Sequence, residues 1–236
     1  LEDARIPFTG SGSASSALCF NKLDAKQKAK AGGVPTAAQA VFQRGSATWM
    51  AKILTDFMSQ QGAIAVKPVT SGSSFGLHMI EKPEQVMAAC ESIAKSPYTD
   101  YMAEKMLRGR ELTVGVIDSE KGLMALPPSE VVLNQGHSFD YEGKYLGRGT
   151  TEITPADLTE PEKKAAQNLA LTAHKVLGCY GYSRTDMILT PTGPVILETN
   201  TLPGMTAASF IPQQLTAAGI EVPAFIERQL ELARKR

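Results

Sequence analysis

The stretch RTDMILTPTGPVILETN, Arg184 to Asn200, contains two strand-forming runs joined by a turn. RTDMIL and PVILETN are rich in apolar residues that favour strands, and TPTGP between them supplies turn-forming residues. A fold-back centred on Thr192 would set Asp186 opposite Glu198 and Arg184 opposite Asn200. Because side chains alternate between the two faces of a strand, all four side chains are predicted to share one face.

This predicted face carries oxygen atoms of the kind that hard cations bind. Magnesium takes carboxylate and carbonyl oxygens and completes its coordination with water and substrate phosphates. Asp186, Glu198 and Asn200 match that requirement. The same residues would also suit the solvated face of an antiparallel sheet. The pattern on its own therefore predicts either a magnesium site or a polar surface.

A second polar segment follows a short apolar run. AIAVKP, residues 63–68, predicts a buried strand, and VTSGSSFG after it predicts a loop. A lysine at the end of such a strand, followed by small hydroxyl residues and glycines, can hold phosphate by charge and by free backbone N–H groups. The segment lacks the Gly-Lys-Ser/Thr ending of a Walker A loop. A phosphate-binding loop and an ordinary surface loop both remain open.

Two further segments offer contacts to a ligand. The runs 101–107 and 111–118, with Gly109 between them, predict a β-hairpin. That hairpin could hold a base through its backbone and a ribose through Glu111, or it could be a plain surface feature. Residues 134–155 show neither helical nor strand periodicity, so they predict a loop that acts as a lid or anchors packing through its aromatic residues.

Composition narrows the class of protein. The 24 basic and 24 acidic residues balance, so the net charge calls for neither nucleic acid nor an anionic membrane as a partner. The three cysteines are far apart, which suits a reducing cytoplasm better than a disulfide framework or a zinc site. No apolar run approaches the roughly 18 residues of a membrane span. Strands and helices alternate irregularly, which favours an α+β fold.

Taken together, these motifs resemble the D-alanine:D-alanine ligase family of ATP-grasp enzymes over essentially the whole chain. The resemblance rests on seven segments that occur in the family's order and at its approximate spacings: NK (21–22), AVKP (65–68), SGSSFG (71–76), EKMLRGRELTV (104–114), YEGKY (141–145), GYSRTD (181–186) and ETNTLPGMT (198–206). It implies an α+β ATP-grasp fold, in which two subdomains with antiparallel sheets enclose the nucleotide.

The resemblance also implies a domain organisation and a cofactor set. We expect residues 1–21 to be the end of an otherwise absent N-terminal domain and its linker, and residues 22–105 to be the central ATP-grasp subdomain. Residues 106–236 are then the C-terminal ATP-grasp subdomain, with lid loop 134–155 and the metal site. The residues that the resemblance assigns to ATP are Lys22 and Lys67 for the phosphates, Glu104, Lys105 and Leu107 for the adenine, and Glu111 for the ribose. The residues assigned to two Mg²⁺ ions, for which Mn²⁺ can substitute, are Asp186, Glu198 and Asn200.

The implied reaction makes D-alanyl-D-alanine for peptidoglycan synthesis. ATP phosphorylates the carboxylate of one D-alanine, and the amine of a second D-alanine attacks the acylphosphate. Arg184 and the backbone N–H of Gly204 would stabilise the tetrahedral oxyanion, and Ser209 would hold the carboxylate of the second substrate. In the family, oxyanion contacts of this kind matter most in the transition state.

The lid is expected to determine closure and specificity. By resemblance, Ser73 and Tyr145 latch the closed lid, and Lys144 lies near the γ-phosphate. Tyrosine at position 145 favours the dipeptide over a depsipeptide made with D-lactate. Departures from the family pattern at Ser71, Met106 and Thr201-Leu202 keep open an ATP-grasp ligase for another amino or hydroxy acid. The expected absence of the N-terminal domain keeps open a non-catalytic Mg-ATP-binding module. We expect a cytoplasmic protein, and the resemblance leaves a homodimer open, because ligases of this type are commonly dimers.

Overall fold

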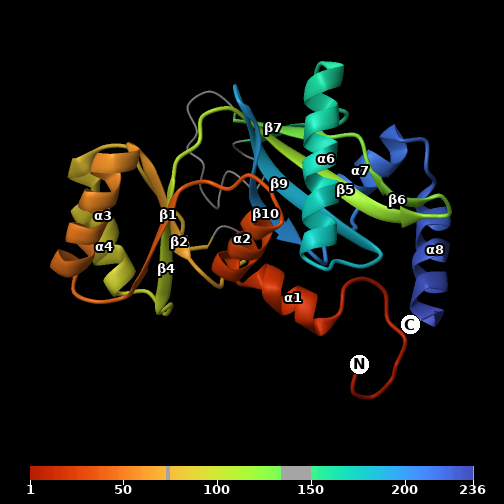
Figure 1. The fold of residues 1–236 in the computed structure, drawn as a ribbon, viewed down its shortest axis with the longest axis horizontal. Helices are drawn as coiled ribbons and strands as arrows, with labels where there is room; N and C mark the ends of the chain where they lie inside the picture. The colour runs from red at the N-terminus through yellow and green to blue at the C-terminus, as the bar shows by residue number, and fades with distance from the viewer. Residues whose placement is uncertain (73–74, 134–149, 236) are drawn as a thin grey trace. The chain divides into compact units, whose positions relative to one another are not determined.

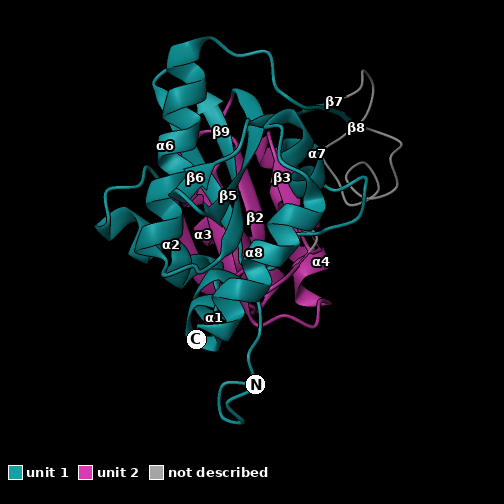
Figure 2. Ribbon diagram, turned by 90° about the vertical axis from the view of Figure 1, so that its right-hand side faces the viewer, with its two compact units in different colours: residues 1–36, 109–132, 151–236 teal, residues 37–108, 133–150 magenta. Residues whose placement is uncertain are grey.

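The computed structural model describes residues 1–72, 75–133 and 150–235 of the chain. The chain divides into two compact units, which Figure 2 draws in different colours. Unit 1 comprises residues 1–36, 109–132 and 151–236, and unit 2 comprises residues 37–108 and 133–150. Each unit packs helices on an antiparallel sheet, which confirms the predicted α+β class. No described helix has both the length and the apolar character that crossing a bilayer requires.

Unit 2 is built on a sheet with the strand order β1-β4-β2-β3. Its elements are β1 (Gln39–Gln43), α3 (Ala47–Gln61), β2 (Ile64–Pro68), β3 (His78–Ile80), the 3-10 turn η1 (Pro83–Gln85), α4 (Val86–Ala94) and β4 (Asp100–Lys105). Met50, Leu54 and Met58 recur every four residues, so α3 buries one face. Residues of α3, α4 and the strands form a single core. The predicted strand at residues 63–68 is confirmed as β2.

Unit 1 contains a larger sheet with the strand order β10-β9-β5-β7-β8, and β6 pairs with β5 (Figure 1). Its strands are β5 (Arg110–Ser119), β6 (Gly122–Ala125), β7 (Ser129–Leu133), β8 (Thr150–Ile153), β9 (Tyr182–Thr190) and β10 (Gly193–Asn200). Its helices are α1 (Ser13–Phe20), α2 (Lys22–Ala31), α6 (Glu160–Val176), α7 (Phe210–Ala217) and α8 (Val222–Arg234).

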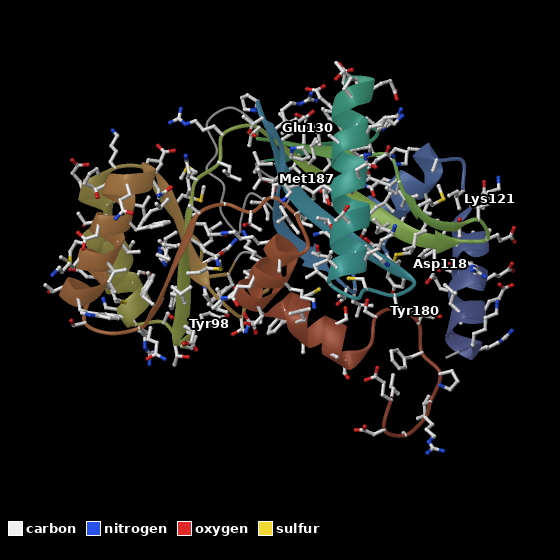
Figure 3. The ribbon with its side chains drawn as sticks, in the orientation of Figure 1. Tyr98, Asp118, Lys121, Glu130, Tyr180 and Met187 are labelled. Carbon is white, nitrogen blue, oxygen red and sulfur yellow. The ribbon has the colours of Figure 1, made fainter. Side chains whose placement is uncertain are left out.

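Side chains alternate between the two faces of the sheet in unit 1, and helices pack against both faces. Met187, labelled in Figure 3, belongs to the core on the face covered by α6, α1 and α2. Tyr182 belongs to a second core with Ile211 of α7 and Phe225 of α8. Because Asp186 and Arg184 alternate with Met187 on β9, they lie on the face that α7 and α8 cover. This face carries the candidate site.

The hairpin predicted from residues 101–118 is wrong. β4 pairs with β1 and β2 in the sheet of unit 2, whereas β5 pairs with β9, β7 and β6 in the sheet of unit 1. Both edges of each strand are therefore taken by other partners. Gly109 is also not in a tight turn: a Cβ added there would lie 2.2 Å from the carbonyl oxygen of Leu189, so glycine is needed for close approach to β9.

The predicted pairing of Asp186 with Glu198 and of Arg184 with Asn200 is confirmed, although the route to it differs. The turn is shorter than predicted, and near it Gly193 pairs with Thr190, one residue out of the predicted register. A β-bulge between Ile196 and Glu198 then inserts one residue into β10 and restores the predicted pairs. The bulge is therefore what places Glu198 opposite Asp186.

A buried histidine makes the stability of unit 1 depend on pH. His174, on α6, is 1% exposed and lies 2.7 Å from the hydroxyl of Ser183 through Nδ1. Burial lowers the pKa of His174 to about 4, from 6.5. The folded state thus prefers the neutral ring of His174. The stability that the neutral ring contributes is complete above pH 6.5 and is lost as the pH falls toward 4. We expect a loss of about 3 kcal/mol over that range.

Urea unfolding at pH 7 and at pH 4.5 tests this expectation. In His174→Gln, which cannot gain a proton, the free energy of unfolding should fall less between the two pH values than in the wild type. Equal pH dependence in the two proteins would show that other groups control the loss of stability.

Candidate functional site

Asp186 lies at the centre of the polar cluster on β9 and is only 7% exposed. Its Oδ1 accepts hydrogen bonds from the hydroxyl of Thr113, at 2.5 Å, and from Nε of Arg184, at 2.8 Å. Its Oδ2 accepts from the other arm of Arg184, at 2.8 Å, and from Nδ2 of Asn200, at 3.3 Å. A carboxylate offers about four lone-pair positions, so four donors already surround this group.

Glu198 completes the predicted set of oxygen ligands. It is half-buried and sits directly opposite Asp186 on β10, two residues before Asn200. Within the described residues, no three His, Cys, Asp or Glu side chains group together as a metal site. The set here consists instead of two carboxylates and one amide, all with oxygen donors, which suits magnesium better than zinc.

A cation bound at Asp186 would have to take the place of existing donors. Arg184 is the one that holds both oxygens of Asp186, and its side chain is 19% exposed. Asn200 could present its carbonyl oxygen instead of its NH₂ group by rotation of the amide, because the two ends are nearly alike in shape. The donor set therefore fits a hard cation provided that Arg184 moves away from Asp186.

Arg184 also contacts the first residue of α7. Its guanidinium carbon lies 5.5 Å from the ring centroid of Phe210, a cation–π geometry. Phe210 directly follows Ser209, the N-cap residue of α7. The guanidinium is thus close to the residue that the resemblance assigns to substrate binding. No pattern in the sequence indicated a role for Phe210, because the contact joins residues distant in the chain.

Gly204 and Ser209 lie side by side, as the resemblance implies. A Cβ added at Gly204 would be 2.7 Å from Oγ of Ser209, so a side chain at this position would push the hydroxyl of Ser209 aside. Oγ of Ser209 accepts from the backbone N–H of Thr206, at 3.2 Å, and does not cap α7.

The ribose candidate, Glu111, is buried on β5 two residues before Thr113. The two side chains therefore point to the same face as Asp186. The preceding residue, Arg110, forms a bidentate pair, with distances of 2.7 and 2.6 Å, with Glu130 of β7. Glu130 is labelled in Figure 3. This pair fixes the start of β5. In the motif ELTV, Thr113 stands two residues after Glu111. The alternation of side chains along a strand could therefore have placed Thr113 on the face of the candidate site.

Lys22 opens α2 and is buried. The side chain of Asn21 accepts from the backbone N–H groups of Leu23 and Asp24, at 3.1 Å each, so the helix begins at a fixed residue. Lys26, one turn later, is buried on the same face of the helix. Sequence reasoning missed Lys26, although its spacing from Lys22 in KLDAK was visible.

In unit 2 the structure brings together two residues assigned to ATP. The ammonium group of Lys67 lies 2.5 Å from the carboxylate of Glu104, and the side chains are 15% and 5% exposed. The pair crosses from β2 to β4, where Ala65 is the residue directly opposite Glu104. Lys105 has an exposed side chain, and its backbone N–H donates a hydrogen bond to the carbonyl oxygen of Ala38. Leu107 is half-buried after β4.

Three assigned residues lie outside the described part of the chain. They are Ser73, Lys144 and Tyr145. Their roles in a lid, and the preference of Tyr145 for a dipeptide product, stay predictions.

Comparison with known proteins identifies relatives over the whole chain. The family model described as D-ala D-ala ligase C-terminus matches residues 29–231. The D-alanine--D-alanine ligase of Leptospira interrogans is 39% identical over 243 residues, which cover 100% of this chain and 68% of that protein.

Solved structures give the same result. D-alanyl-alanine synthetase A from Vibrio cholerae aligns with a TM-score of 0.87 at 27% identity, over 99% of this chain and 71% of the other. The VanG D-Ala:D-Ser ligase from Enterococcus faecalis aligns with a TM-score of 0.83 at 31% identity, over 98% of this chain and 66% of the other. The chain thus spans about two thirds of the length of these relatives. Both the sequence match and the ATP-grasp fold show that the chain belongs to the D-alanine–D-alanine ligase family.

Proposed function

We propose that this protein joins two D-alanines to D-alanyl-D-alanine, with ATP converted to ADP and phosphate, and that it supplies peptidoglycan synthesis. Its family consists of ADP-forming ligases, which use ATP and a divalent cation. The observation that carries the proposal is the cluster on β9 and β10. There Asp186, opposite Glu198 and hydrogen-bonded to Asn200, lies beside a guanidinium and faces α7.

In this proposal Asp186, Glu198 and Asn200 hold the cation. We propose two Mg²⁺ ions that share Glu198, with Mn²⁺ as a substitute. When bound, the cation would neutralise negative charge on the phosphates while the γ-phosphoryl group is transferred. The chain's own contribution is to keep three oxygen ligands on two adjacent strands, so that only the side chain of Arg184 and the amide of Asn200 have to reorient on binding.

Arg184 would act on the second step. Once the cation takes the oxygens of Asp186, the guanidinium needs a new negative partner. Attack of the D-alanine amine on the acylphosphate carbonyl forms a tetrahedral oxyanion, and phosphate then leaves as the peptide bond forms. Arg184 and the backbone N–H of Gly204 would stabilise this oxyanion, while Ser209 holds the carboxylate of the attacking D-alanine. The contact between Arg184 and Phe210 supports this assignment.

The nucleotide contacts are also part of the proposal. Lys22 and Lys67 would bind phosphates, and Glu111 would bind the ribose. Glu104, Lys105 and Leu107 would bind the adenine. The short ion pair between Lys67 and Glu104 supports the assignment, because it holds the ammonium group in one place before ATP arrives. We further propose a cytoplasmic homodimer that needs neither nucleic acid nor a membrane.

A panel of acceptors tests the substrate assignment. With Mg-ATP, the release of ADP is measured with D-alanine alone and with D-alanine mixed with D-serine or D-lactate. We expect D-alanine alone to support turnover, with the dipeptide as product. ADP release that requires D-serine or D-lactate would identify a ligase for another acceptor. ATP binding without ADP release that depends on an amino acid would identify a non-catalytic module.

A further inference from the structure

The buried hydroxyl of Thr113 is a part of the site that the proposed reaction does not use. Thr113, on β5, is paired in register with Asp186, on β9, so the two side chains emerge side by side on one face. Both are buried, with Thr113 2% exposed, and Oγ1 lies 2.5 Å from Oδ1 of Asp186. An ionised carboxylate can only accept hydrogen bonds. The proton of the hydroxyl must therefore point at Oδ1.

We propose that Thr113 is a positioning residue, which fixes the orientation of the Asp186 carboxylate for cation binding. This inference rests on the proposed function, in which Asp186 is a cation ligand. Hydrogen bonds to a ligating carboxylate orient it, and their loss typically weakens metal binding by about 10- to 100-fold. Among the donors to Asp186 named above, the Thr113 hydroxyl combines nearly complete burial with the absence of charge.

The different donors around Asp186 have different freedom to move. Arg184 is partly exposed, and as a charged group it can be exchanged for another cation. Thr113 cannot turn away without leaving a buried hydroxyl unpaired, which costs free energy. When the cation displaces Arg184, the bond from Thr113 is thus the one that stays. It keeps Oδ1 in place and leaves Oδ2 to turn toward the cation.

The backbone of β5 is itself held at Thr113 by Gln214, a fully buried side chain of α7. Its Nε2 donates to the carbonyl of Thr113, at 2.9 Å, and to the hydroxyl of Ser129, at 3.0 Å. Its Oε1 accepts from the N–H of Gly115, at 2.8 Å. The amide thus acts as a strand partner at the place where the pairing of β5 changes from β7 to β6. This clamp leaves Thr113 little freedom to shift.

Cation binding by variants of Thr113 tests the inference directly. Mn²⁺ is titrated into the protein with one equivalent of a non-hydrolysable ATP analogue, and free Mn²⁺ is measured by electron paramagnetic resonance. Thr113→Val keeps the shape of the side chain but removes the hydroxyl, and we expect it to weaken Mn²⁺ binding by about 10- to 100-fold. Thr113→Ser restores the hydroxyl and should bind Mn²⁺ within about threefold of the wild type.

A matched control separates positioning from general damage to the sheet. Thr185→Val also removes a buried hydroxyl, this time on β9. That hydroxyl is hydrogen-bonded to the hydroxyl of Thr199, and both lie on the face of the sheet opposite to Asp186. This variant should lose some stability but bind Mn²⁺ as the wild type does. Wild-type Mn²⁺ binding by Thr113→Val, or equal weakening in Thr113→Val and Thr185→Val, would overturn the inference.

The variant Asp186→Asn shows whether a negative result concerns only the positioning role of Thr113 or the proposed cation site as a whole. If Asp186→Asn loses Mn²⁺ binding while Thr113→Val retains it, Asp186 is a ligand and only the positioning role is wrong. If Asp186→Asn binds Mn²⁺ as the wild type does, the cation site itself is wrong, and the inference is overturned together with it.

Discussion

Replacing Glu198 by alanine is expected to lower the rate of ADP formation by about 1,000-fold while the protein stays folded. The proposed site has only three oxygen ligands, and Glu198 is the one assigned to both cations. A divalent cation supplies several kcal/mol of transition-state stabilisation, and each 1.36 kcal/mol corresponds to a factor of ten in rate. Because Glu198 is half-buried near the end of β10, its truncation should cost little stability.

The measurement is a steady-state ADP assay at saturating ATP and D-alanine, together with the melting temperature of each variant. Glu198→Gln separates charge from shape, since it keeps the volume and loses the carboxylate, and it should be nearly as inactive as the alanine variant. Glu160→Ala is the matched control, because Glu160 is a largely exposed carboxylate that forms a surface ion pair with Lys163. Normal turnover by Glu198→Ala would disprove the metal assignment.

Replacing Lys67 by methionine is the second change with a large expected effect. Methionine keeps most of the side-chain length but removes the ammonium group, which we assign to an ATP phosphate. A charge-assisted hydrogen bond contributes roughly 1.5–3 kcal/mol, so the KM for ATP should rise by about 10- to 100-fold. Stability should fall as well, because the buried carboxylate of Glu104 would lose the positive charge that lies 2.5 Å away.

A double variant separates these two effects of Lys67. In Lys67→Met/Glu104→Gln, the buried negative charge is also removed, so the melting temperature should recover toward that of the wild type. The KM for ATP should remain high, because the ammonium group is still missing. If the KM recovered together with the melting temperature, Lys67 would be a structural partner of Glu104 and its role in ATP binding would be refuted.

Local patterns predicted some elements of this structure well. Alternation and the turn residues of TPTGP were enough to predict that β9 and β10 pair as antiparallel neighbours, since both strands are close in the chain. The bulge between Ile196 and Glu198 left no signal in the composition of the strand. The correct pairing came from two offsets, a shorter turn and an added residue, that cancel each other.

Non-local pairing was beyond the reach of the same reasoning. The runs at residues 101–107 and 111–118 looked like a hairpin because they are adjacent strands with glycine between them. Their true partners are distant in the chain, and the partner of a strand is decided by the packing of whole sheets. The contacts of Thr113 with Asp186 and of Gln214 with β5 also join distant residues. The order of several motifs, rather than any single one, indicated the family.

The most direct test of the whole account is to measure ADP and D-alanyl-D-alanine together in one reaction with Mg-ATP and D-alanine. The account predicts equal amounts of the two products, both dependent on Mg²⁺ and D-alanine and both lost in Glu198→Ala. ADP without dipeptide, or the same yield of dipeptide from the wild type and Glu198→Ala, would contradict it.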